Sequence, residues 1–410
     1  MLVLADAVAA DLLVSGPLTL VDADGRREVP ALIVKDGRIA YAGPVAPEDA
    51  GLERLDAPGA FVMPGLVDAH VHLSLAPGGA FVDRTPEEIR ARRAHHLRAY
   101  VASGVAAVLD AGILPEDAAQ IEELVTEGPA PVVRMLGPLV SPPGGYVHEV
   151  LPVFPATPDA TALAAQVDAF ARFDPIGIKV TMEDGMLTNI WPLHDPTVLE
   201  AVNALDQPVF VHAMEPREYR YALDHLDVHA FVHPLEHPKR DVVERLAGIP
   251  VVTTLSAFDH LLTTAEPERL DDPLIRLVAP ADEIEAATDR ETIRASYRFV
   301  ARTLMPHMFP PARAVARAAM SQKAFVASKV RSFQKAVVAL HESGVELVLG
   351  SDSGNWPVLL TELHGPTTIR EVELLLEAGL PFDDVLAMST VRGARLLGLE
   401  EDFGMLADGR

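Results

Sequence analysis

The sequence predicts an α/β protein, a (β/α)8 TIM barrel with a small flanking β module, and three observations support this fold class. Short apolar runs alternate with helical stretches along most of the chain, which is typical of buried parallel strands joined by helical crossovers. Several of these runs end in a polar residue, as expected where the strand ends of a barrel meet at one mouth. The chain has 410 residues, more than the roughly 250 of a plain barrel, so additional modules are expected.

Residues 1–60 are predicted to form the small module. Short alternating strands are expected at residues 12–14, 18–21, 31–35 and 38–41, and the turn signals Asp24-Gly25 and Asp36-Gly37 separate them. This pattern predicts an antiparallel sheet. We expect residues 400–410 to begin a return to the module, and residues 2–5 are a candidate for one more strand.

Residues 61–399 are predicted to form the barrel. Its eight strands are expected at residues 65–73, 106–110, 132–136, 176–181, 208–212, 230–233, 251–255 and 346–350. Helices are expected between them, for example at residues 86–103, closed by Gly104, and at residues 196–205.

The last crossover is unusually long. About 90 residues separate the seventh and eighth strands, against about 30 in an average barrel unit. A long helical stretch is expected at residues 311–342, which leaves residues 257–310 as an insertion over the mouth of the barrel. Its apolar side chains favour a lid or a pocket wall that selects a substrate with an apolar portion, and a dimer contact or a helical pad outside the barrel is the alternative.

Six polar residues stand at or just beyond predicted strand ends. His70 and His72 are two apart, so on a strand both imidazoles project from one face. The other four follow the same rule at later strands: Lys179, His212, His233 and Asp352. Imidazole and carboxylate groups are common metal ligands, and strand ends of a barrel converge, so the pattern predicts a metal site.

These residues carry a resemblance to the amidohydrolase superfamily of metal-dependent hydrolases. The chain resembles that family in the motif Pro64-Gly-Leu-Val-Asp-Ala-His-Val-His72, in the later strand-end lysine and histidines, and in Gly350-Ser-Asp352. The match is colinear over residues 12–399 and is most similar to the binuclear branch, near imidazolonepropionase-like and prolidase-like hydrolases. The resemblance implies that the small module is a β-sandwich.

The resemblance also implies two divalent ions, expected to be zinc. His70, His72 and Asp352 would hold one ion, His212 and His233 the other, and Lys179, carboxylated by carbon dioxide, would bridge them. A hydroxide between the ions would attack a carbonyl carbon of an amide, lactam, lactone or ester, with Asp352 as the catalytic proton carrier. For Lys179 the alternative is an ammonium that pairs with Glu183, which would then be the bridge.

Other functions remain open at this point. The same fold supports decarboxylases and phosphotriesterase-like enzymes, and a metal-free interaction protein is a third class. Tyr146 and His148 are candidate substrate-binding residues because their loop follows the third strand. His95, His96 and His341 are expected to be exposed on helices, whereas His237, His260 and His364 are weaker candidates for the pocket lining.

Composition narrows the partners and the compartment. The chain lacks cysteine, which excludes disulfides and thiolate metal sites and favours a cytoplasmic location. Its 34 basic and 59 acidic residues give a net charge of -25, which argues against nucleic acid or an anionic membrane as partner. No apolar run approaches the roughly 18 residues of a membrane span, and the first residues lack the positive start of a signal peptide. We therefore expect a small-molecule substrate, and homo-oligomerisation is left open.

Overall fold

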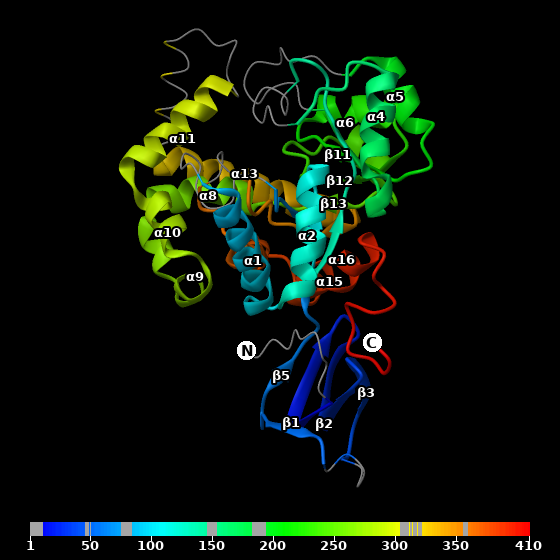
Figure 1. Ribbon diagram of the computed structural model, residues 1–410, viewed down its shortest axis with the longest axis vertical. Coiled ribbons are helices and arrows are strands. Elements are labelled where there is room, and N and C mark those ends of the chain that lie inside the picture. Colours follow the sequence, from blue (N-terminus) through cyan, green and yellow to red (C-terminus); the bar gives the residue numbers. More distant parts are fainter. Residues whose placement is uncertain are drawn as a thin grey trace.

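The computed structural model describes residues 11–45, 49, 51–74, 84–145, 154–182, 194–303, 311, 314, 318, 322–355 and 360–410, with the side chains of residues 300–303 left out. A larger α/β body stands above a small β module that contains the first strands of the chain (Figure 1). The predicted mixed α/β class with parallel sheets is confirmed. Within the described ranges, no helix is both long enough and apolar enough to cross a membrane.

The small module is one five-stranded sheet. Its strands are β1 Leu12–Asp22, β2 Gly25–Lys35, β3 Arg38–Ala42, β4 Glu53–Asp56 and β5 Phe61–Val62. β1, β2 and β3 are antiparallel as predicted, whereas β4 and β5 pair with β1 in parallel. The runs predicted as separate strands at residues 12–14 and 18–21 belong to the single strand β1, because a bulge at Gly16 (φ 125°) lets the strand continue past Pro17.

The end of the chain lies against this module. The Leu406 amide donates a hydrogen bond to the carboxylate of Asp22 at 3.2 Å. The main chains of Ile39 and Gly409 are also bonded, with the Gly409 amide as donor at 2.7 Å. These contacts lie where the sequence predicts a return toward the module, and the candidate strand at residues 2–5 is outside the described residues.

The parallel strands form two sheets, ordered β6-β7-β8 and β14-β13-β12-β11-β10-β9. Their bounds are β6 Leu66–Val71, β7 Val105–Asp110, β8 Val132–Met135, β9 Leu139–Val140, β10 Ile178–Thr181, β11 Val209–His212, β12 Val228–Phe231, β13 Val251–Val252 and β14 Leu347–Val348. Each of the eight predicted regions overlaps one of these strands, and β9 is an addition.

Main-chain hydrogen bonds connect the two sheets at both edges. Beyond β14, the Asp352 amide donates to the carbonyl oxygen of His70 at 2.8 Å. At the opposite edge, the amide of Ile176 donates to the carbonyl oxygen of Met135 at 3.0 Å. Buried side chains from both sheets also form one apolar cluster, including Ala69, Leu109, Phe210, Val252 and Val348.

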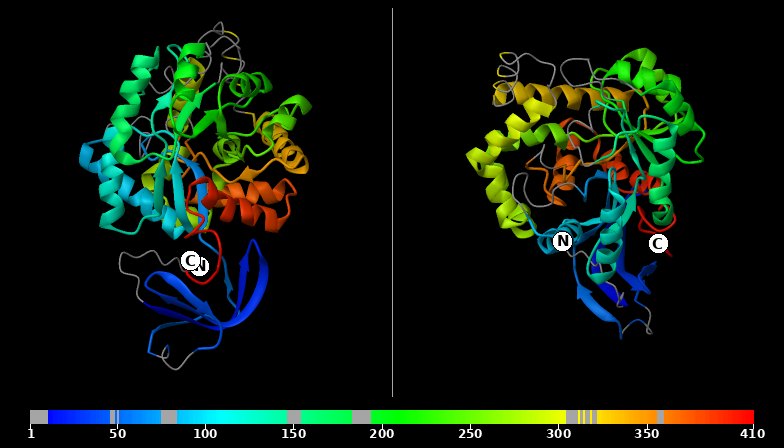
Figure 2. Two further views of the ribbon diagram at one scale, coloured as in Figure 1. Left: turned by 90° about the vertical axis from the view of Figure 1, so that its right-hand side faces the viewer. Right: turned by 45° about the horizontal axis from the view of Figure 1, so that its top comes forward.

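Helices surround the strands (Figure 2). They are α1 Pro86–Ala102, α2 Pro115–Glu127, α4 Ala160–Phe170, α5 Pro196–Asn203, α6 Pro216–His225, α7 Arg240–Val243, α8 Ser256–Ala265, α9 Pro273–Val278, α10 Ala281–Thr288, α11 Arg290–Thr303, α13 Lys323–Glu342, α14 Pro366–Glu377, α15 Phe382–Met388 and α16 Val391–Leu396. The largest apolar cluster lies between the strands and helices such as α5, α13 and α14.

The bounds of α1 follow from local chemistry. Thr85 and Glu88 form a reciprocal capping box at its start, and Pro86 occupies the first turn, where a missing amide hydrogen costs nothing. The chain leaves the helix at Gly104, whose φ of 81° favours glycine. The predicted helix at residues 86–103 is therefore confirmed to within one residue.

Two predicted elements need correction. The helical stretch expected at residues 311–342 is interrupted, because Gln322 has extended backbone angles and α13 begins only at Lys323. The strand expected at residues 251–255 ends at Val252. Leu255 already has helical angles there, and its amide, together with that of Ser256, donates to the carboxylate of Glu371.

The segment predicted as an insertion is described over residues 257–303 and packs against two parts of the body. Leu270 and Ile284 bury their side chains against Leu360 and Leu363, in the segment before α14. α9 and α10 also dock on α1, where Glu283 accepts a hydrogen bond from the imidazole of His96 at 2.7 Å. His96 is 1% exposed, so the prediction of an exposed His96 is wrong: the insertion covers it, a contact that helix periodicity cannot show.

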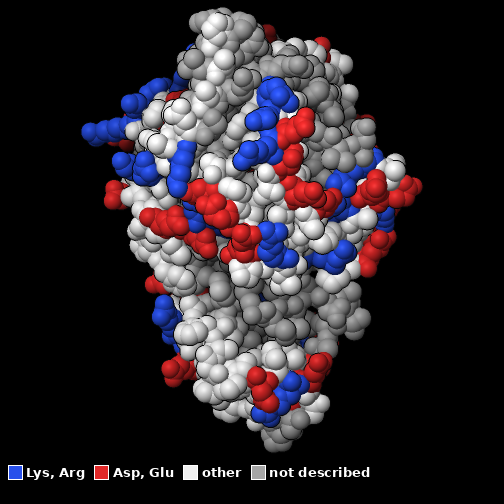
Figure 3. All heavy atoms as spheres, turned by 90° about the vertical axis from the view of Figure 1, so that its left-hand side faces the viewer, with Lys and Arg blue, Asp and Glu red and all other residues white. Residues whose placement is uncertain are grey.

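Acidic and basic side chains are interleaved on the face shown in Figure 3, where α9 to α11 lie. Arg84 and Arg92 both bind Asp282 across the junction of α1 and α10. On this face acidic side chains therefore lie beside basic ones and do not form one continuous negative patch.

Candidate metal centre

His70 and His72 form the first half of the candidate site. His70 lies within β6, which is buried along its whole length, and His72 follows its end. The two Nε2 atoms are 3.3 Å apart, as expected for residues that project from one face of a strand. Burial, assisted by the charge of Lys179, lowers the pKa of His70 to about 3, so its imidazole is neutral at physiological pH.

Asp352 reaches these histidines from the segment after β14. Its Oδ1 atom lies 3.2 Å from His70 Nε2 and 3.0 Å from His72 Nε2. The approach depends on Gly350, where an added Cβ would lie 2.9 Å from the Cβ of His70. Asp352 itself has a φ of 59°, an uncommon conformation that Asp tolerates better than most residues.

Lys179, on β10, is 2% exposed. Its Nζ lies 3.4 Å from His70 Nε2. Burial lowers its pKa to about 8, against the partly opposing charge of Asp352. A substantial fraction of this amine is therefore uncharged in mildly alkaline solution, which an ordinary lysine is not.

His212 and His233 come from the next two strands. His212 ends β11, and its ring centroid is 4.4 Å from that of His233, which follows β12. The His233 ring is in turn 4.8 Å from that of His70. His233 Nδ1 pairs with the hydroxyl of Thr254 at 2.8 Å, which fixes the ring and turns Nε2 away from that partner. Burial, the largest cause, lowers the pKa of both histidines.

The donor set fits a divalent cation. His70, His233 and Asp352 each offer one ligand atom, and these atoms lie within 4.8 Å of one another. A neutral imidazole carries an acceptor lone pair on one ring nitrogen, so with the proton on Nδ1 the Nε2 atoms of His70 and His72 and the Asp352 oxygen can all bind one cation. The Nδ1 atoms of His70 and His72 are buried without a hydrogen-bond partner among the described residues.

Sequence reasoning missed several polar residues that support this cluster. Asp68 accepts hydrogen bonds from the amides of His70 and Ser351, and so ties β6 to the segment after β14. Asp110, which ends β7, accepts from the amides of Leu73 and Gly112. Asp110 ends an apolar run like the six candidates, and Asp68 lies on the same strand face as His70. The first pattern could have identified Asp110 from the sequence, and the second could have identified Asp68.

Three candidates from the sequence lie outside the described residues: Tyr146, His148 and Glu183. Of the weaker histidine candidates, His260 is buried in α8 and lines a cavity. His364 is also buried, and its Nδ1 pairs with the hydroxyl of Tyr100 at 2.9 Å. His237 has an exposed side chain.

A sequence model of the amidohydrolase family matches residues 191–410, which is more than half of the chain. The chain belongs to the amidohydrolase family. This confirms the resemblance found in the sequence.

Curated relatives match over shorter segments. An imidazolonepropionase of Saccharopolyspora erythraea is 40% identical over 104 residues, which is 25% of this chain and 25% of that protein. A deacetylase of Agrobacterium fabrum is 40% identical over 81 residues, 20% of this chain and 17% of that protein. The chain thus aligns with a quarter or less of the length of these relatives.

Solved structures match over nearly the whole chain. A Xaa-Pro dipeptidase crystallised with bound methionine has a TM-score of 0.70 at 18% identity, over 98% of this chain and 92% of that one. At this identity the likeness establishes the fold.

Proposed function

We propose that this protein is a metal-dependent hydrolase that cleaves an amide, lactam, lactone or ester bond of a small organic molecule. The observation that carries the proposal is the convergence of His70, His72 and Asp352 at 3.0 to 3.3 Å, with three potential ligand atoms facing one another. Two imidazole nitrogens and a carboxylate oxygen in this arrangement form a favourable cation site.

We infer that the two parallel sheets constitute one (β/α)8 barrel. Main-chain hydrogen bonds join the sheets at both edges, and their inward side chains share one apolar cluster. In such a barrel the functional residues stand at the C-terminal ends of the strands, which is where the six candidates lie. The β-sandwich assignment of the small module remains a prediction.

His70, His72 and Asp352 would hold one ion, His212 and His233 the other, and Lys179 would contact both. When bound, divalent ions polarise a carbonyl group and lower the pKa of water. Lys179 is suited to carboxylation because its uncharged amine can add to carbon dioxide, forming an N–C bond and releasing a proton. The carbamate then supplies two anionic oxygens where an ammonium would repel cations.

Asp352 would carry the proton. Its Oδ1 faces the two histidines, and its Oδ2 accepts a hydrogen bond from the Asn355 side chain at 3.3 Å. A carboxylate in this place can take the proton of the attacking water and return it to the leaving group. The 3% exposure of the side chain limits competing proton exchange with solvent.

The comparisons support this class of reaction. The matched proteins include an imidazolonepropionase, a deacetylase and a Xaa-Pro dipeptidase. Zinc as the metal, the cytoplasmic location and the roles of Tyr146 and His148 stay predictions.

Metal analysis of matched variants tests the proposal. The purified protein should contain two divalent ions per chain, and Lys179→Ala should lose metal and regain part of it with short carboxylic acids. Lys323→Ala is the control, because Lys323 forms an ion pair with Glu266 and both residues lie outside the groups that could hold a metal ion. One ion or fewer after metal loading would contradict the binuclear assignment, and a metal-free active protein would overturn the proposal.

The substrate class can be screened with the metal-loaded protein. Peptides, N-acyl amino acids, lactones and aryl esters cover the carbonyl compounds that the site would accept. Hydrolysis of at least one class, abolished in Lys179→Ala, is the expected outcome. Metal binding without hydrolysis of any class would favour another reaction on the same site.

A further inference from the structure

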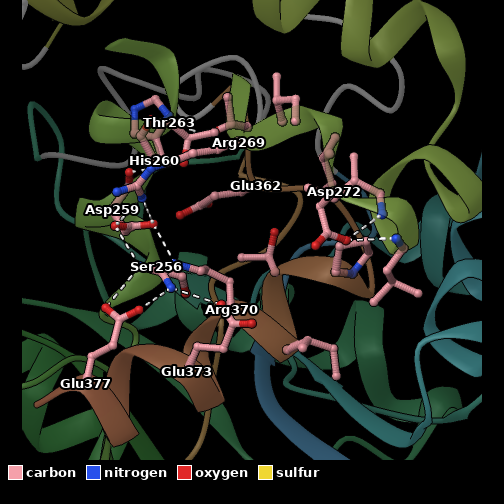
Figure 4. Close-up of a pocket in the computed structure, with 18 residues that line it drawn as sticks. Ser256, Asp259, His260, Thr263, Arg269, Asp272, Glu362, Arg370, Glu373 and Glu377 are labelled. Atoms are coloured by element: carbon pink, nitrogen blue, oxygen red, sulfur yellow. Dashed lines mark hydrogen bonds and ion pairs between the residues drawn. The ribbon is translucent and has the colours of Figure 1, made fainter. Parts of the chain in front are cut away.

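The cavity that His260 lines is polar and lies near the candidate metal centre. Its volume is about 350 Å³, and its walls come from α8, the following turn Pro267–Asp271, α9, the segment before α14 and α14 itself (Figure 4). The insertion therefore contributes to the lining, through residues such as Leu274 and Ile275. No candidate metal ligand lines this cavity.

Most charged groups of the cavity neutralise one another. Asp259 binds both guanidinium groups, those of Arg269 and Arg370. Arg370 also pairs with Glu373 and Glu377. Because both arginines are engaged, neither is available for an anionic ligand.

Glu362, in contrast, is not neutralised by an ion pair with these arginines. Its side chain is 1% exposed, and both carboxylate oxygens are buried without a hydrogen-bond partner among the described residues. In Figure 4 the side chain extends into the opening between Asp259 and Arg370 on one side and Asp272 on the other. A buried carboxylate that lacks a donor is unfavourable unless a ligand supplies one.

Glu362 lies next to the segment that carries Asp352. Its carbonyl oxygen accepts a hydrogen bond from the amide of Gly354 at 3.0 Å, two residues after Asp352. Burial raises the pKa of Glu362 well above its ordinary value, and the negative charge of Asp352 raises it further. A cation bound between the cavity walls would relieve both penalties.

We propose that this cavity binds a positively charged nitrogen group, a primary ammonium, with Glu362 as its anionic partner. An ammonium offers three hydrogen-bond donors and the charge opposite to that of the unpaired carboxylate. Leu274, Ile275 and Ile369 line the same cavity and would contact an alkyl portion of the ligand. Resting on the proposed function, the inference is that the natural substrate carries an amine together with its hydrolysable carbonyl.

Calorimetric titration with n-pentylammonium and with n-pentanol tests this site directly. The two probes share an alkyl chain and differ in charge, so the wild-type protein should bind the ammonium at least about tenfold more tightly. Glu362→Gln should abolish that preference. Glu373→Gln is the control, since Glu373 lines the same cavity but is exposed and paired with Arg370; it should keep the preference.

Equal binding of the two probes by the wild type would overturn the inference, and so would a preference that survives in Glu362→Gln. Metal content, measured on the same samples, separates this result from the proposed function. Two bound ions with no ammonium preference would overturn only the cavity assignment. Ammonium binding by a chain that takes up no metal would support the cavity and contradict the hydrolase.

Discussion

Two pairs of buried carboxylates in this protein differ in their hydrogen bonding. Asp68 lies in β6 and Glu371 in α14, and each accepts four hydrogen bonds from protein groups. Neither oxygen of Glu362 accepts a hydrogen bond from the described residues, and Asp352 Oδ1 is paired with the Nε2 atoms of two candidate metal ligands, His70 and His72. All four residues are at most 3% exposed, so burial alone does not separate them.

The number of protein donors therefore distinguishes a carboxylate that anchors the fold from one that is a candidate ligand-binding group. Asp68 joins β6 to the segment after β14, and Glu371 joins α14 to the start of α8. Both carboxylates hold elements in place and need nothing further. Asp352 and Glu362 instead point into space that a metal ion or a charged ligand would complete, and their buried oxygens are a cost to the unliganded fold.

The largest expected effect is on turnover. Asp352→Asn should lower the rate by at least about a hundredfold, because an amide cannot carry the proton, while the melting temperature stays near that of the wild type. Steady-state kinetics on the best substrate of the screen, with metal content measured in parallel, checks this. Near-normal turnover would remove Asp352 from the reaction.

Glu371→Gln should show the opposite pattern, a loss of stability. The new amide NH2 group would face donors where a carboxylate oxygen accepted hydrogen bonds, at an expected cost of about 2 to 4 kcal/mol in the free energy of unfolding. Urea denaturation measures it, with the exposed Glu373→Gln as the control on the same helix. Equal stability of the two variants would contradict the anchoring role.

The pH dependence of stability offers a further check on Glu371. Burial raises its pKa from 4.5 to about 7, so the folded state binds more protons than the unfolded state between these values. This group therefore makes the free energy of unfolding fall as the pH rises from about 4.5 to about 7. The variant should lack this component, which denaturation at several pH values would reveal.

Thr368→Val should give an intermediate effect. It removes one of the four donors to Asp68 with little change in volume, and a cost of about 1 to 2 kcal/mol is expected because the carboxylate is fully buried. Asn355→Ala, which removes the single donor to Asp352 Oδ2, is the comparison and should change stability by less than about 0.5 kcal/mol. Similar losses in both variants would erase the distinction between the two carboxylates.

Glu362→Gln should have only a small effect near neutral pH, within about 1 kcal/mol in the free energy of unfolding, because no protein hydrogen bond is lost. Its pKa is raised by burial, so the wild type loses stability as the pH rises above the ordinary value of 4.5. The variant should therefore become the more stable of the two as the pH increases. A stability difference that does not change with pH would mean that Glu362 is not a buried, unpaired acid.

The sequence by itself determined the positions of the parallel strands and the six candidate ligands. Strand periodicity puts His70 and His72 on one face, and the ends of apolar runs locate Lys179, His212 and His233. These signals are local, so they survive without knowledge of the packing. The family resemblance adds the expected order of the ligands along the chain, and the family match confirms membership of that family.

Only the tertiary structure decided which buried polar groups are satisfied. The partner of His96 is Glu283, almost two hundred residues later, and the cavity around Glu362 forms only where the insertion packs against α14. A carboxylate has the same sequence signature whether four donors or none surround it. Its partners come from elements that are distant in the chain, and folding alone brings them within hydrogen-bond distance.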